Sequence, residues 1–154
     1  MKRRAQRGHV MLELALSAGV MAAALAGTFQ FGYTFYVYNQ LVTAVGNGGR
    51  YAALRTYRAA GPADTEKGKS AIINMVVYGD AHPAEGAAPI IANLKPENVR
   101  LEWVAGEGGG APVAVDVAIT GYQVNAIFGG MTLEGKPAVE FPFAGRYAPG
   151  ESEP

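Results

Sequence analysis

The sequence contains no cysteine, which excludes a disulfide framework and metal sites built from thiolates. Serine is also scarce, and its three positions form no Ser-His-Asp pattern with the two histidines: Ser17, Ser70 and Ser152, with His9 and His82. The glycine-rich stretch 106–110 lacks the Lys-Ser/Thr pair of a phosphate-binding loop, so it predicts a turn. Nothing in the sequence therefore indicates an enzyme or a cofactor.

Charge is missing from a long part of the chain. After Glu13 no formal charge occurs until Arg50, a neutral run of 36 residues. Four cations precede this run: Lys2, Arg3, Arg4 and Arg7. Without them nine basic residues stand against 13 acidic ones. No basic patch is left to neutralise phosphates, so we expect no binding of nucleic acid.

Residues 10–31 are long and apolar enough to cross a membrane, since roughly 20 apolar residues span a ~30 Å hydrocarbon core. Positive charge before the span places the N-terminus in the cytoplasm and the rest of the chain outside. Aromatic residues crowd its far end: Phe29, Phe31, Tyr33, Phe35, Tyr36 and Tyr38. They are typical of a membrane-interface belt, although packing in a core is an equal alternative for Phe35 and Tyr38.

Small residues recur at every fourth position of this span, a spacing that lets two helices approach closely in lipid: Ala15, Gly19, Ala23 and Gly27. A helix running unbroken over 10–58 would be about 74 Å long, so its second half would project from the bilayer. Glycines that favour a bend or an end follow later: Gly46, Gly48 and Gly49.

Glu13 is the one acid in the apolar run, and an ionised acid deep in a bilayer costs about 3 kcal/mol unless it has a partner. Cleavage after Gly8 would create a new α-amine at His9, one helical turn from Glu13. In staggered parallel helices, the amine of one chain could meet Glu13 of the next. The alternative is that Glu13 reaches water at the cytoplasmic edge. His9 and Glu13 have no further ligand nearby, so we predict no metal site.

The order of basic leader, glycine, glutamate and apolar helix resembles the class III signal of type IV pilins and pseudopilins. Three pieces in order, R-G-x-x-x-L-E-x-A-L, F-x-F-G-Y-x-F-Y-V-Y-N-Q-L and G-x-R-Y-A-A, resemble more narrowly the TadE-like minor pilins of tight-adherence (Flp) pilus systems. This resemblance covers about residues 7–55.

The resemblance implies a membrane-anchored structural protein whose chain a prepilin peptidase cuts after Gly8, which makes Glu13 the fifth mature residue. It places further residues in the characteristic region of the family, without individual roles: Tyr33, Tyr36, Asn39, Arg50 and Tyr51. The implied partners are the membrane, other pilin or pseudopilin subunits through the N-terminal helix, the peptidase and the pilus assembly machinery. The implied location is the inner membrane or the pilus, with the C-terminal domain outside the cytoplasm.

Residues 59–63 predict the end of the long helix at Gly61 and Pro62. A second helix is predicted over 65–78, capped by Asp64 and closed by Gly79. One face of this helix carries Ile72, Met75 and Val76. Residues 80–98 contain three prolines and predict a loop, in which His82 would be solvated.

Three segments alternate between apolar and polar residues as strands do: 99–104, 112–120 and 136–145. The second has the strongest pattern, with an apolar face of Val113, Val115, Val117 and Ile119. Residues 122–128 are ambiguous between strand and loop. Pro142 predicts an edge position for the last strand. Asp116 and Glu140 are expected to face solvent without a basic partner.

Together these segments predict an α+β fold with a long N-terminal membrane helix, a short second helix and a small C-terminal antiparallel sheet of about three strands. The expected division is a leader over 1–8, an assembly helix over 9–58 and an exported domain over 59–154. Two other interpretations stay open. Ala24-Leu25-Ala26 matches a signal-peptidase site before Gly27, which would release a secreted domain, or the helix could be an uncut anchor.

Overall fold

The computed structural model describes residues 3–54, 57–58, 62–105, 112–126, 128–144 and 147–148. Its helices are α1 (Arg3–Ala53), α2 (Pro62–Tyr78) and the short 3-10 turn η1 (Pro96–Asn98). Its strands are β1 (Tyr57–Arg58), β2 (Val99–Ala105), β3 (Pro112–Ala126), β4 (Gly129–Pro142) and β5 (Tyr147–Ala148).

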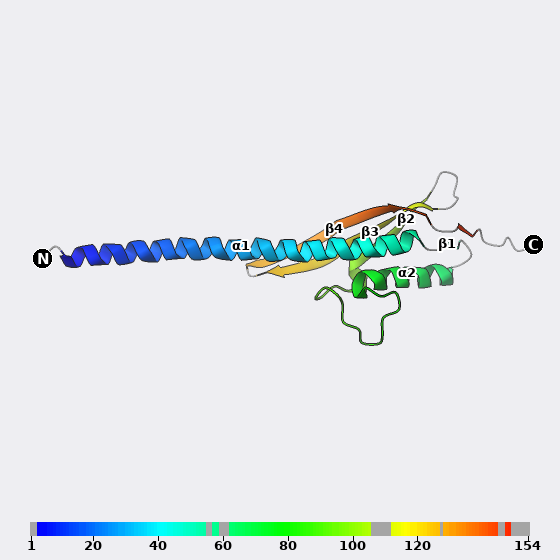
Figure 1. Cartoon of the computed structure of the whole chain (residues 1–154), viewed down its shortest axis with the longest axis horizontal. Coiled ribbons are helices and arrows are strands. Elements are labelled where there is room, and N and C mark those ends of the chain that lie inside the picture. Colours follow the sequence, from blue (N-terminus) through cyan, green and yellow to red (C-terminus); the bar gives the residue numbers. More distant parts are fainter. Residues whose placement is uncertain are drawn as a thin grey trace, which may run out of the picture.

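Helix α1 runs straight through the molecule, and its two halves differ in their surroundings (Figure 1). The N-terminal half stands free, whereas the C-terminal half contacts β3, β4 and α2. The predicted α+β fold, with a long first helix, a short second helix and a three-stranded antiparallel sheet, is confirmed.

The main sheet has the strand order β2-β3-β4, and both neighbouring pairs are antiparallel. Strand β4, which contains Pro142, lies at an edge as predicted. The ambiguous residues 122–126 continue β3, and β4 already begins at Gly129, so this hairpin is longer than expected. The β3–β4 register shifts around Gly121, whose φ of +64° suits glycine. A separate pair of two-residue strands, β1 and β5, is parallel.

The apolar face predicted for β3 is confirmed for Val115, Val117 and Ile119, which are completely buried. It is wrong for Val113, which is 55% exposed. Phe143 donates its N–H to the carbonyl of Val113, and the next residue, Ala144, donates to the carbonyl of Ala53. Val113 thus lies level with the last residue of α1, where the covering helix ends.

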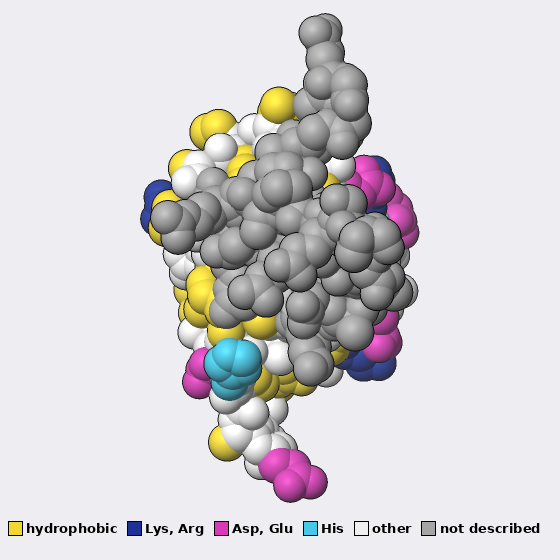
Figure 2. Space-filling view, turned by 90° about the vertical axis from the view of Figure 1, so that its right-hand side faces the viewer, with side chains coloured by type: hydrophobic (Ala, Val, Ile, Leu, Met, Phe, Trp, Pro, Cys, Tyr) yellow, Lys and Arg dark blue, Asp and Glu magenta, His cyan; other side chains and the backbone are white. Residues whose placement is uncertain are grey.

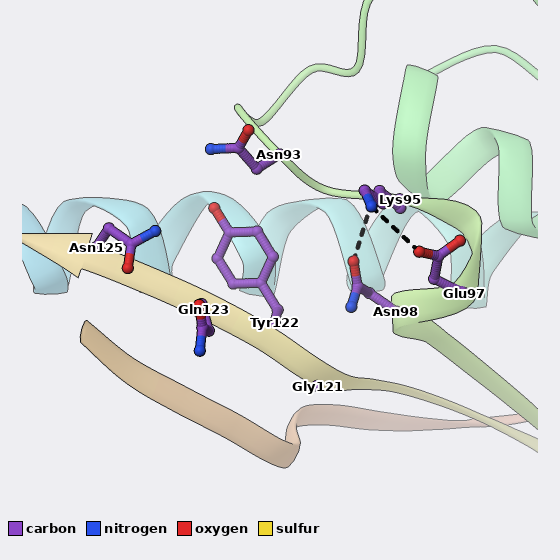
Figure 3. A pocket seen from close by; sticks show the side chains of 8 residues that line it. All are labelled: Asn93, Lys95, Glu97, Asn98, Gly121, Tyr122, Gln123 and Asn125. Carbon is purple, nitrogen blue, oxygen red and sulfur yellow. Dashed lines mark hydrogen bonds and ion pairs between the residues drawn. The ribbon is translucent and has the colours of Figure 1, made fainter.

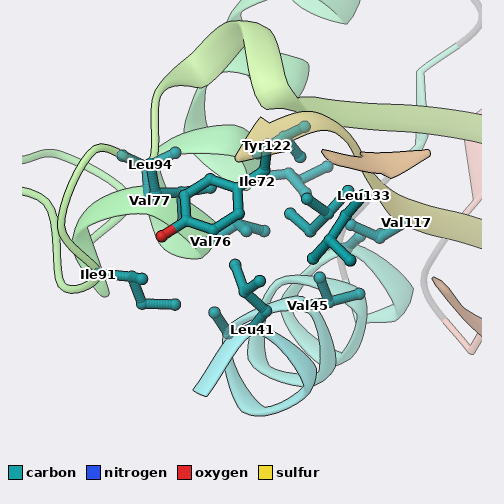
Figure 4. Close-up of a cluster of buried hydrophobic side chains, with 14 of the residues drawn as sticks. Leu41, Val45, Ile72, Val76, Val77, Ile91, Leu94, Val117, Tyr122 and Leu133 are labelled. Atoms are coloured by element: carbon teal, nitrogen blue, oxygen red, sulfur yellow. The ribbon is translucent and has the colours of Figure 1, made fainter. Parts of the chain in front are cut away.

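The core lies where α1, α2 and the sheet meet (Figure 4). Leu41 and Val45 of α1 are fully buried, as is Ile72 of α2. The other large buried side chains of this cluster come from α2, the following loop and the sheet: Val76, Val77, Leu94, Val115, Val117 and Ile119. The second half of α1 therefore supplies one wall of the folded domain.

The prediction of a bend or an end at the glycines of α1 is wrong, because the helix continues through all of them to Ala53. Gly48 and Gly49 are buried, and each allows a neighbour to come close. A Cβ atom at Gly48 would overlap Val76 of α2, and one at Gly49 would lie 2.5 Å from the Phe141 ring of β4. These glycines serve packing, which outweighs their low helix propensity.

The predicted ends of the helices need two corrections. Helix α1 ends at Ala53, several residues before Gly61. Helix α2 begins at Pro62, so Asp64 lies inside its first turn instead of capping it; proline suits the first helical position because its missing N–H is not needed there. The closing role of Gly79 is confirmed by its φ of +73° and by its N–H bond to the carbonyl of Met75 at 3.1 Å. The predicted turn at 106–110 lies outside the described residues. The sequence also predicts a polar C-terminal tail over 148–154, of which residues 149–154 lie outside the described residues.

Replacing Gly48 by alanine tests the close approach of α1 and α2. Gly48→Ala should lower the free energy of unfolding by about 1–3 kcal/mol relative to Gly46→Ala, because only the former overpacks a buried contact. Both changes gain the same helix propensity, so their difference reports the contact alone. Urea unfolding of the full chain in detergent, followed by Trp103 fluorescence, measures it. Equal midpoints for the two variants would contradict the packing role of Gly48.

Candidate functional site on the N-terminal helix

The free half of α1, which we define as residues 8–25, has every side chain exposed. Its large apolar residues are between 60% and 72% exposed: Val10, Met11, Leu12, Leu14, Leu16, Val20, Met21 and Leu25. A helix that is apolar all round belongs in a protein core or in a membrane. By length and composition α1 can cross a membrane, and its most apolar window is not buried inside the protein.

The predicted processing and assembly residues lie on this free half. Gly8 and His9 are consecutive residues within α1, so the bond between them is part of the helix. Glu13 lies one turn further on, and all three residues are exposed. In the part of the chain that the structure describes, no group of three His, Cys, Asp or Glu side chains could hold a metal ion.

The small-residue face is open along most of its length. Ala15, Gly19 and Ala23 are exposed, and Gly27 is half-buried where the folded domain begins. A Cβ atom built on Gly19 or Gly27 would meet nothing within 4 Å. No part of the described chain covers this face at Gly19, so a second helix could approach it closely.

The aromatic segment divides into an exposed and a packed set. Phe29, Phe31 and Phe35 are 61–68% exposed, which for Phe35 favours the interface alternative over the core. Tyr38 instead packs against the core, as does Tyr51. The other residues of the family pattern are exposed: Tyr33, Tyr36, Asn39 and Arg50.

The predicted site residues are spread along one helix and do not converge on a cavity. From Gly8 to Tyr51 the helix rises about 65 Å. Such an arrangement cannot hold a small substrate between its side chains, but it can present a long surface to lipid and to other helices.

One contact of this helix could not be found from the sequence. The side-chain oxygen of Gln30 accepts a hydrogen bond from the backbone N–H of Phe128 at 3.0 Å, and its amide nitrogen lies 3.5 Å from the carbonyl oxygen of Gly129. These two bonds tie the tip of the β3–β4 hairpin to α1 at the end of its free half. The partners are 98 residues apart, and no local pattern links them.

A polar hollow of about 250 Å³ lies between the loop before β2 and strand β3 (Figure 3). Its polar groups mainly hold that loop in place. The Tyr122 hydroxyl donates to the carbonyl of Ala92 at 2.9 Å, and the Asn98 amide donates to the carbonyl of Thr120 at 3.1 Å. Burial raises the pKa of the Tyr122 hydroxyl. Lys95 and Glu97 form an exposed ion pair at 3.4 Å.

The outer face of the sheet carries a row of acids in register across three strands: Glu102, Asp116 and Glu140. Arg100 bonds to Glu102 at 2.7 Å, which raises the pKa of the guanidinium and lowers the pKa of the carboxyl. The charge of Asp116, which lies opposite Glu102 in the strand register, adds to the raised pKa of Arg100. At the domain end seen in Figure 2, visible acids and bases are interspersed around the grey residues. His82 is exposed, as predicted.

Comparison with known protein families identifies a match on α1. Residues 8–50 match the family model described as TadE-like protein. No curated protein and no solved structure matches the chain. The matched segment covers the free half of α1, the aromatic segment and most of the helix that enters the core. The resemblance to the TadE-like proteins of tight-adherence pilus systems is thereby confirmed.

Replacing Gln30 by alanine should loosen the hairpin tip. Losing one hydrogen bond of this kind costs about 0.5–1.5 kcal/mol, which corresponds to up to roughly tenfold faster amide exchange at Phe128. Hydrogen–deuterium exchange of the full chain in detergent measures this rate. Gln40→Ala is the control, because Gln40 bonds to Tyr36 on the same helix. If both variants exchange alike at Phe128, Gln30 does not hold the tip.

Proposed function

Because the chain carries the TadE-like segment, we propose that it is a structural, non-catalytic minor pilin or pseudopilin of a tight-adherence (Flp-type) pilus. The free half of α1 anchors it in the inner membrane, with the N-terminus in the cytoplasm and the folded domain outside. Its partners are other pilin or pseudopilin subunits, a prepilin peptidase and the pilus assembly machinery. The observation that best supports this proposal is that the free half of α1 is apolar, contains one acid, Glu13, and is exposed on all sides.

The charge pattern supports the orientation and the processing step. The basic residues before Gly8 stay on the cytoplasmic side, where the peptidase would cut after Gly8. The bond to be cut lies within α1, so the helix must unwind locally to enter an active site. Glycine favours this opening, since it weakens a helix by about 1 kcal/mol relative to alanine.

Cleavage would change the charge balance at the helix end. It removes the four cations of the leader and exposes an α-amine on His9. Glu13 is exposed and free to face another subunit. When parallel helices are staggered by one turn, the amine of one subunit meets Glu13 of the next. Pairing inside the apolar layer would neutralise both charges and select one register.

The open small-residue face supports assembly through the same helix half. Ala15, Gly19 and Ala23 would let neighbouring helices approach, and the apolar side chains around them would fill the remaining space. Since the second half of α1 belongs to the core, an assembly built on the free halves would carry each domain outward in a fixed orientation. Adhesion or surface attachment would then be a property of the displayed domains.

The mature N-terminus tests the processing step. Mass spectrometry of the membrane fraction should find a chain starting at His9 in cells with the peptidase, and an uncut chain in cells lacking it. A soluble chain starting at Gly27 would contradict the proposal and support a secreted domain with an ordinary signal peptide. An uncut chain in cells that have the peptidase would support a plain signal anchor.

Glu13→Ala tests the register role of the carboxylate. The variant should insert into membranes like the unchanged chain, because it removes a charge from the apolar run. It should nevertheless reduce co-purification with partner pilins and pilus assembly by about tenfold or more, the effect of roughly 1.4 kcal/mol. Ser17→Ala, one turn further along the same face, is the control. Normal pili with Glu13→Ala would exclude the pairing of this carboxylate with a neighbour.

A further inference from the structure

The described residues at the tip of the β3–β4 hairpin, Ala126, Phe128 and Gly129, lie beside the point where α1 becomes free. Gln30 bonds to the tip, and the exposed half of α1 ends five residues earlier at Leu25. Figure 1 shows the hairpin running back along α1 toward its free half.

The height of the tip above a membrane follows from the length of the free half. Its 18 residues rise about 27 Å, close to the ~30 Å hydrocarbon core of a bilayer. From Leu25 to Gln30 the helix rises about 7.5 Å more. The headgroup region on each side of the hydrocarbon is roughly 5–8 Å thick. A membrane that takes up the free half therefore places the tip at headgroup depth.

The protein surface around Gln30 and the hairpin tip has the composition expected at headgroup depth. Phe128 at the tip is 67% exposed, and Met131 on β4 is 49% exposed. Phe29 and Phe31 on α1, adjacent to Gln30, are 61% and 68% exposed. Neither segment carries charge near this level, because α1 has none over 14–49 and the hairpin sequence has none over 117–133. Single exposed apolar residues are ordinary, but here two separate elements expose them at one height.

We propose that the hairpin tip is a second membrane contact, in which Phe128 enters the boundary between headgroups and acyl chains of the leaflet from which α1 emerges. The inference rests on the membrane anchoring in the proposed function. The lipid surface is the occupant that the observations favour, because the tip is bonded to α1 at the depth where aromatic side chains anchor proteins. With both the free half of α1 and the hairpin tip in the membrane, the tilt of the protein against the membrane is fixed. With α1 alone in the membrane, the tilt would not be fixed.

The test places a single tryptophan at the tip of the full chain in phosphatidylcholine vesicles. Trp103 is the only tryptophan, so Trp103→Phe provides the background for Phe128→Trp. Val113→Trp is the matched control, because Val113 is also well exposed and lies near the start of β3, at the end of the hairpin away from the tip. It is level with Ala53, about 35 Å along α1 from Gln30. With brominated acyl chains, the Phe128→Trp variant should lose about half its tryptophan emission or more, whereas the emission of the Val113→Trp variant should be unchanged.

Three other results of this quenching experiment would contradict the hairpin contact or the membrane anchoring. If the protein floats with the vesicles but the Phe128→Trp variant stays unquenched, the hairpin contact is wrong and the membrane anchoring stands. If the protein does not float with the vesicles, the membrane anchoring is wrong and the hairpin contact is overturned with it. If solvent protection of the Phe128→Trp tryptophan rises with the protein-to-lipid ratio without quenching by bromine, the tip contacts another copy of the chain and the proposal is overturned.

A second label removes the dependence on Trp103→Phe. The chain has no cysteine, so Met131→Cys gives a unique site for an environment-sensitive fluorophore while Phe128 stays in place. Its emission should shift to the blue on binding vesicles, and the shift should be lost when Phe128→Ser is added. A shift unaffected by Phe128→Ser, or no shift in floated protein, overturns the role of Phe128.

Discussion

The packing of the second half of α1 against β3, β4 and α2 is the constraint on which the other features depend. Leu41 and Val45 are fully buried in it, and Gly48 and Gly49 let α2 and β4 approach the helix backbone. Because one continuous helix carries both this wall and the free half, the domain cannot change orientation without moving the free half as well. The free half and the folded domain share one unbroken helix, an arrangement that suits the proposed role as a subunit of a regular assembly.

One helix thus meets two environments, and the change occurs over a few residues. Up to Leu25 the helix is exposed on every side, and nothing in the described chain covers its apolar side chains. From Val37 onward one side is buried by the sheet and the other faces outward. Gln30 lies between these parts, and its side chain is turned to the hairpin tip. The boundary is set by how far the hairpin extends along α1, since the helix itself shows no break there.

Much of the fold could be predicted from local patterns. The strands at 99–104 and 112–120, the edge position of Pro142 and the helix stop at Gly79 depend on neighbours in sequence, so periodicity and turn chemistry reveal them. The errors have a common physical origin. Intrinsic preference alone mispredicts Gly48, Val113 and Asp64, because their states depend on α2, on the end of α1 and on where Pro62 starts the second helix. Residues 122–126 are ambiguous in the sequence because their pairing with β4 makes them a strand.

The basic N-terminal residues, the glycine before the apolar run, the single acid and the TadE-like pattern could be recognised from the sequence alone, because charge and hydropathy along one helix do not depend on distant contacts. The strand periodicity of the sheet could be recognised in the same way. Three features could be seen only in the folded chain: which half of α1 is free, the packing role of the glycines, and the position of Phe128 beside Gln30 at the end of the free half. They depend on contacts between residues up to 98 positions apart, and such contacts exist only once the chain has folded.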